Sequence, residues 1–200
     1  TNRKQLMMYG NDGSLSPGTI TVAEASAVET DTYTTPVAVG DSLYAAYSAG
    51  FGGGMYELFP ESESGFASRD VSLQVPGYLP EGPRALRASS KHNMIFWLDD
   101  GSGSNAEIAD RERIFVYTFD QSGPNKTQSA WTKWSVNYNN TTGEAGYHIR
   151  NMVTMGDRLY LIAESNGHVI IEYIDLDILV PQTDLDDTTE AAFAGVMLDR

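Results

Sequence analysis

The chain has 200 residues, of which 13 are Lys or Arg and 27 are Asp or Glu, so its formal net charge is −14. This charge argues against a conventional nucleic-acid-binding protein, which presents a basic patch to phosphates. Cysteine is absent, which excludes disulfide frameworks, zinc ribbons and thiol catalysis. No apolar run exceeds the five residues of Met94 to Leu98. A membrane helix needs roughly 20, so we expect no membrane anchor.

Short runs of β-branched and aromatic residues, bounded by Gly, Asp, Asn or Ser, predict β-strands along most of the chain. In chain order, the clearest runs lie at residues 5–9, 42–47, 54–59, 93–98, 113–119, 158–163 and 167–173. Helical spacing of apolar residues is scarce before residue 188, and residues 188–198 are compatible with one short helix or another strand. We therefore predict an all-β protein.

The predicted strands come in similar units. A turn followed by an apolar strand occurs near Asp41, His92 and Asp157, and each time a second apolar strand follows after another turn. Units of about 40–50 residues with about four strands are typical of β-propeller blades, because one small sheet cannot cover both of its own faces. We predict a partial β-propeller of blade-like antiparallel sheets, and a β-sandwich is the alternative architecture.

We treat residues 1–200 as a single β-rich region. The blade-like units are expected at about 36–80, 84–137 and 150–178, and residues 179–200 as an acidic connection and the start of a next unit. Propellers typically have about four to eight blades. Since the chain holds fewer units and starts with Thr1 rather than Met, we expect it to be a piece of a longer protein.

Candidate catalytic groups are few. The three histidines, which lie in no zinc-protease or nucleophile-elbow motif, are His92, His148 and His168. The pairs Asp99–Asp100 and Asp175/Asp177 could serve glycoside hydrolysis, but such residues are more typical of a solvated loop or the wet face of a strand. The loop after Asp99 also lacks the spacing of a calcium site. We expect no catalytic residue, no cofactor and no metal, and therefore not an enzyme.

Aromatic residues are the remaining signal. Trp131 and Trp134 lie three residues apart in one predicted strand, so their side chains are expected on opposite faces. Exposed rings can stack on sugars or bases, but packing between adjacent blades is the commoner use and the one that we expect. With Trp97, in the strand at 93–98, and Tyr78, in the proline-rich segment 75–83, these tryptophans are predicted to be structural residues.

Several segments together resemble the tail tubular protein B family, the tail nozzle proteins of short-tailed bacteriophages. Residues 69–80 carry Arg-Asp-Val-Ser followed by Val-Pro-Gly-Tyr, and the strand at 114–119 is followed by Gln-Ser-Ala-Trp-Thr-Lys-Trp at 128–134. Gly-Asp-Arg-Leu-Tyr-Leu at 156–161 and the closing Leu-Asp-Arg at 198–200 complete the family's order. The match runs from about residue 6 to the end of the chain.

The resemblance implies a structural protein of the virion tail, made in the host cytoplasm and containing a β-propeller region. It implies a ring of six copies at the distal end of the tail, around the channel through which DNA leaves. The implied partners are other copies of the chain, the tubular adaptor protein and the tail fibres, and DNA would pass without specific binding. Acidic residues fit this role because they repel phosphates. The alternative function is a carbohydrate-binding or glycan-hydrolysing β-propeller.

Overall fold

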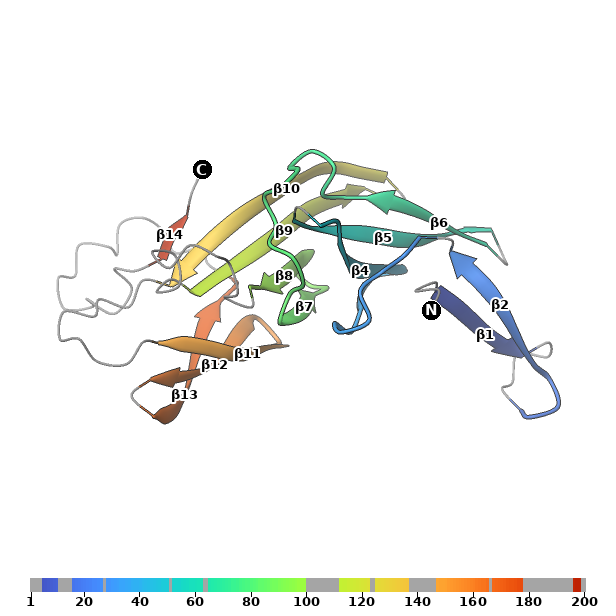
Figure 1. The fold of residues 1–200 in the computed structure, drawn as a ribbon. Coiled ribbons are helices and arrows are strands. Elements are labelled where there is room, and N and C mark those ends of the chain that lie inside the picture. The colour runs from blue at the N-terminus through green and yellow to red at the C-terminus, as the bar shows by residue number, and fades with distance from the viewer. Residues whose placement is uncertain are drawn as a thin grey trace. The chain divides into compact units, whose positions relative to one another are not determined.

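The computed structural model describes residues 5–10, 16–26, 28–50, 52–62, 65–99, 112–122, 125–136, 147–165, 167–177 and 196–198. They form β-strands joined by turns and irregular connections (Figure 1) and divide into two compact units, Thr1–Gly82 and Pro83–Arg200. The all-β prediction is confirmed, in the form of four small antiparallel sheets. Within the described ranges, no helix has the length and apolarity of a membrane span.

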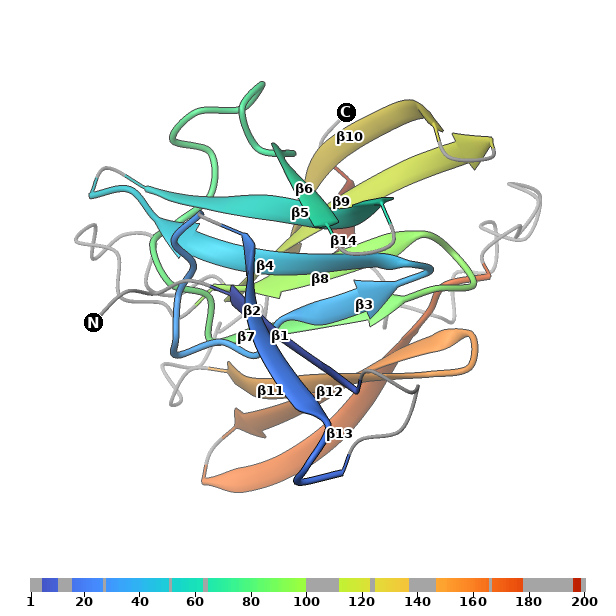
Figure 2. The same ribbon diagram turned by 90° about the vertical axis from the view of Figure 1, so that its right-hand side faces the viewer.

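The first unit contains a hairpin and a four-stranded sheet. The hairpin consists of β1 (Gln5–Gly10) and β2 (Ile20–Ser26). In the sheet each strand pairs with the next along the chain, an order called a meander that can be followed in Figure 2. Its strands are β3 (Val37–Val39), β4 (Ser42–Ser48), β5 (Gly53–Ser62) and β6 (Gly65–Asp70). Gly40, with φ of 58°, makes the tight β3–β4 turn, because glycine adopts the left-handed conformation at little cost.

The second unit contains two meanders. The strands of the larger one are β7 (Ala85–Ser89), β8 (Met94–Leu98), β9 (Glu112–Ser122) and β10 (Asn125–Val136). The three-stranded one consists of β11 (His148–Met155), β12 (Arg158–Ser165) and β13 (His168–Asp175). The chain then returns to the larger sheet, where β14 (Val196–Leu198) pairs with β10. The sequence was compatible with either a short helix or a strand at residues 188–198. The structure has a strand there, β14, and residues 188–195 lie outside the described residues.

The three turns that the sequence singled out occupy equivalent places. Asp41 lies between β3 and β4, His92 between β7 and β8, and Asp157 between β11 and β12. Each turn therefore joins the first and second strands of a meander. The repeat in the sequence corresponds to a repeat in strand order.

Buried apolar residues lie on both faces of the β7–β10 sheet. Consecutive apolar residues of its strands reach both faces, because alternate residues of a strand point to opposite sides. One face packs against the β11–β13 sheet and forms a cluster that we call the inter-sheet core. Its buried members are Ala85, Phe96, Leu98, Ile114, Val116, Tyr147, Ile149, Met152, Leu159, Leu161 and Ala163. Burying one large apolar side chain contributes about 1.5–3 kcal/mol, so this cluster is a main source of cohesion between the two sheets.

Candidate functional site

The first strands of the two meanders in the second unit, β7 and β11, contact each other at the edges of their sheets. Arg84 Nη1 donates to the Ile149 carbonyl at 2.5 Å. Arg87 Nε donates to the Met152 carbonyl at 2.6 Å, and its Nη2 donates to Asn151 Oδ1 at 2.9 Å. An edge strand leaves some backbone groups without a strand partner, and the guanidinium groups satisfy two of these carbonyls. We call these five residues the β7–β11 seam.

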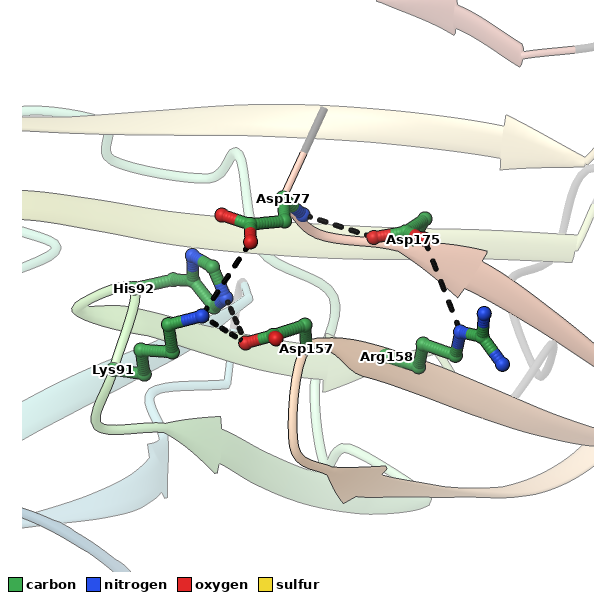
Figure 3. A network of polar contacts seen from close by, with 6 residues as sticks. All are labelled: Lys91, His92, Asp157, Arg158, Asp175 and Asp177. Atoms are coloured by element: carbon green, nitrogen blue, oxygen red, sulfur yellow. Dashed lines mark hydrogen bonds and ion pairs between the residues drawn. The ribbon is translucent and has the colours of Figure 1, made fainter. Parts of the chain in front are cut away.

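A charged network lies between the turns at the end of β7 and the end of β11 (Figure 3). Lys91 forms an ion pair with Asp157, and its Nζ lies 3.4 Å from Asp177 Oδ2. His92 Nε2 lies 3.3 Å from Asp157 Oδ1. The hydrogen bond between Lys91 and Asp157 raises the pKa of Lys91 and lowers the pKa of Asp157, so both shifts favour the charged pair. Because both side chains are exposed, the pair contributes little to stability.

A second ion pair lies beside this network. Arg158 Nε is 3.8 Å from Asp175 Oδ2, across the β12–β13 pair. The Arg158 guanidinium also lies over the Tyr173 ring, 4.3 Å from its centroid. Asp175 Oδ1 in turn accepts a hydrogen bond from the Asp177 backbone N–H at 3.1 Å. Asp175 is therefore held by Arg158 and by the backbone N–H of Asp177, and Asp177 is held by Lys91 of the turn after β7.

Three contacts between the two meanders of the second unit share one spacing in the sequence. Arg84 and Ile149, Arg87 and Met152, and His92 and Asp157 are each 65 residues apart. This is also the interval between the His92 and Asp157 turns. Equivalent positions of successive meanders therefore contact each other. The contacts of Arg84, Arg87 and Lys91 were not predicted from the sequence. The 65-residue interval between the His92 and Asp157 turns is the sequence feature that relates these residues to the equivalent part of the next meander.

The predicted structural tryptophans occupy different environments. Trp134 packs against the inter-sheet core, with its ring centroid 5.8 Å from that of Phe96. Trp131 lies on the opposite face of β10, with its ring centroid 5.1 Å from that of Tyr117. Trp97 is fully buried in β8. The alternation of strand side chains thus separates Trp131 from Trp134.

Tyr78, the fourth predicted structural residue, lies in the turn segment between β6 and β7. Its backbone N–H donates to the Val75 carbonyl at 3.0 Å. The adjacent Leu79 is buried and forms an isolated antiparallel bridge with Gly53 at the start of β5. The proline-rich segment is therefore a turn that is attached to the first unit's sheet.

Three of the four carboxylates considered for hydrolysis are engaged in ion pairs. Asp99 is buried and pairs with Arg113. Asp175 and Asp177 are the partners of Arg158 and Lys91 described above, and Asp100 lies outside the described residues, as does the loop considered for calcium. His148 and His168 are exposed at the starts of β11 and β13. In the part of the chain that the structure describes, no group of three or more His, Asp or Glu side chains could hold a metal ion.

Comparison with known proteins connects this arrangement to a family. A family model described as "Bacteriophage nozzle protein" matches residues 1–197, and no curated protein matches the chain. The match covers nearly the whole chain and therefore shows its family. It confirms the resemblance indicated by the ordered segments between residue 6 and the C-terminal residues.

Proposed function

We propose that this chain, which belongs to the bacteriophage nozzle protein family and is a structural component of the virion tail, forms part of the channel through which DNA leaves the particle. In this proposal it acts by assembly rather than by catalysis. It also provides a platform to which other tail proteins attach, namely the tubular adaptor and the tail fibres. Copies of the chain form a ring, with six copies as the proposed number.

The observation that carries the proposal is the contact between equivalent positions of successive meanders. A β-propeller stacks small antiparallel sheets around an axis, so that each sheet packs face to face against the next. The β7–β10 and β11–β13 sheets pack in this way through the inter-sheet core, and their first strands meet along the β7–β11 seam. This supports a partial propeller with blade-like units near 36–80, 84–137 and 150–178. Such a body is a rigid element suited to the wall of a tail.

The arrangement of charged groups supports a non-enzymatic role. Asp99, Asp175 and Asp177, three of the four carboxylates considered for hydrolysis, form ion pairs with Arg113, Arg158 and Lys91. A hydrolase needs a carboxylate whose pKa is tuned for proton transfer and which lies in a cleft with its substrate. The glycan-directed alternative would need that combination, and these three carboxylates are used in structural pairs instead.

The net charge supports passage of DNA without retention. At −14 the chain repels phosphates, so a duplex near its surface slides rather than adsorbs. An electrophoretic mobility shift with double-stranded DNA at moderate salt tests this property. We expect no shifted band, whereas tight binding that weakens with added salt would contradict the proposal. In parallel, release of sugars from host-surface glycans by the purified chain would favour the glycan-directed alternative.

A further inference from the structure

Two connecting segments of the first unit leave the four-stranded sheet at the same end. Residues 28–36 lead into β3, and residues 71–82 follow β6. Because neighbouring strands are antiparallel, the start of β3, the end of β4, the start of β5 and the end of β6 lie at one end of the sheet. We call residues 28–36 and 71–82 the loop end. Connections at one end of a rigid sheet are a common place for binding residues.

Hydrogen bonds to the sheet hold both segments in place. The Asp31 backbone N–H donates to the Ala46 carbonyl at 2.7 Å, and the Gly53 N–H donates to the Leu79 carbonyl at 2.9 Å. Asp31 Oδ1 also accepts a hydrogen bond from the Tyr33 backbone N–H at 2.9 Å. Segments fixed in this way lose little conformational freedom when a partner binds. The loop end is therefore a preformed surface rather than one that a partner must order.

Two large side chains project from the loop end. Tyr33 is 91% exposed and Leu73 is 74% exposed, the highest fractions among the large hydrophobic side chains that the structure describes. Interfaces derive most of their binding energy from a few large side chains, with tyrosine enriched among them. Tyr33 lies two residues after the Asp31 contact, and Leu73 directly follows Ser72, a buried residue whose Oγ accepts from the Met55 N–H at 3.1 Å. Each exposed side chain is therefore attached to anchored backbone.

The loop end is acidic. Its charged residues are Glu29, Asp31 and Glu81, and it contains no Lys, Arg or His. None of these three carboxylates takes part in the ion pairs formed among the described residues. A surface whose negative charges are uncompensated attracts a positive surface and repels phosphates. The complementary partner is therefore a basic protein surface, a character that neither DNA nor a second copy of this chain, with its net charge of −14, possesses.

We propose that the loop end binds a basic surface of another tail protein, in which Lys or Arg side chains surround an apolar pocket. The Leu73 side chain enters the pocket, and the exposed Tyr33 ring takes a cation against its face. The carboxylates of the loop end pair with the remaining basic groups. This proposal rests on the proposed function, because it assigns the attachment role of the chain to one surface.

Surface plasmon resonance tests this contact, with the chain immobilised and each of the other purified tail proteins of the same particle passed over it in turn. One of these proteins should bind, and its binding should weaken as salt is raised from about 50 to about 300 mM, because salt screens pairs of charges. Tyr33→Ala and Leu73→Ala should each weaken the binding at least about tenfold. Glu29→Gln combined with Glu81→Gln should weaken the binding and reduce its salt dependence.

Two matched variants serve as controls. Glu61→Gln removes the same charge from an exposed position of β5 at the opposite end of the sheet. Leu6→Ala truncates a leucine that is 65% exposed in β1. Both variants should bind like the unsubstituted chain. The substituted positions are all exposed, so the fold should be preserved, and Tyr33→Ser and Leu73→Ser replace any variant whose circular dichroism shows loss of fold.

Three results would overturn this contact. They are the absence of binding by any other tail protein, binding that Tyr33→Ala and Leu73→Ala leave unchanged, and a salt dependence that the two glutamate substitutions leave unchanged. A loop end that binds only a second copy of this chain would overturn it as well. None of these results affects the DNA-shift experiment or the location of the chain on the particle. Failure of the contact is therefore distinguishable from failure of the proposed function.

Discussion

The Tyr47 ring lies directly over Gly54, its cross-strand neighbour in the β4–β5 pair. A Cβ atom at residue 54 would fall 2.2 Å from Tyr47 Cζ, a distance that no real contact allows. The close approach lets the Tyr47 hydroxyl donate to Asp70 Oδ2 on β6 at 2.6 Å. Its ring also stacks on Tyr56, with centroids 4.5 Å apart. The absence of a side chain at Gly54 therefore allows one aromatic residue to connect three strands.

Replacing Gly54 with alanine should destabilise the first unit. The added methyl group must displace the Tyr47 ring from its stacked and hydrogen-bonded position, which we expect to lower the free energy of unfolding by about 1–3 kcal/mol. Urea unfolding followed by circular dichroism measures the change. Gly18→Ala is the matched control, because nothing lies within 4 Å of a Cβ atom there. Equal effects of the two substitutions would contradict the role of the close approach.

Tyr47 should make stability depend on pH in the alkaline range. Burial, followed by the hydrogen bond to Asp70, raises its pKa from 10.0 to about 12. Between these values the unfolded chain loses a proton that the folded chain keeps, so the free energy of unfolding falls as pH rises. Tyr47→Phe should reduce this fall, although Tyr56, whose pKa is also raised by burial, should leave part of it. Urea unfolding at pH 8 and pH 11 tests the difference, with Tyr33→Phe, at a residue 91% exposed, as the variant that should behave like the unsubstituted chain.

Arg87→Lys should weaken the β7–β11 seam. Lysine keeps the charge but cannot donate at once to the Met152 carbonyl and Asn151 Oδ1 as the planar guanidinium does. We expect a loss of about 1–3 kcal/mol in the free energy of unfolding and faster hydrogen exchange in β11. Arg150→Lys, which changes an exposed pair with Glu164, should cost less than about 1 kcal/mol. If both variants unfold at the same urea concentration, the seam does not hold the two sheets together.

The three tryptophans should differ in their contribution to stability. Trp97→Ala should cost about 3–5 kcal/mol, because the side chain is fully buried. Trp134→Ala should cost about 2–4 kcal/mol, since the ring is partly buried against the inter-sheet core. Trp131→Ala should cost less than Trp97→Ala, because the Trp131 ring is only partly buried where it contacts Tyr117. Thermal melts that show Trp134→Ala to be neutral would contradict the packing of β10 against the β11–β13 sheet.

The sequence was informative where structure depends on local pattern. Alternation of apolar residues predicted β1, β4, β5, β8, β9, β12 and β13, and the three-residue interval between Trp131 and Trp134 predicted their opposite faces. The contacts of Arg87 with β11 were missed, because they depend on how two sheets pack on each other across 65 residues of chain, which the pattern within each strand does not show. The return of β14 to β10 is a long-range pairing of the same kind.

The location of the chain on the virus particle tests the central claim most directly. Antibody fragments raised against this chain can be bound to particles from the same source and viewed by electron microscopy. The account predicts label concentrated at the distal tip of the tail, around the axis along which DNA leaves. Label on the head, or particles left bare while the antigen is found free or on host cells, would contradict it.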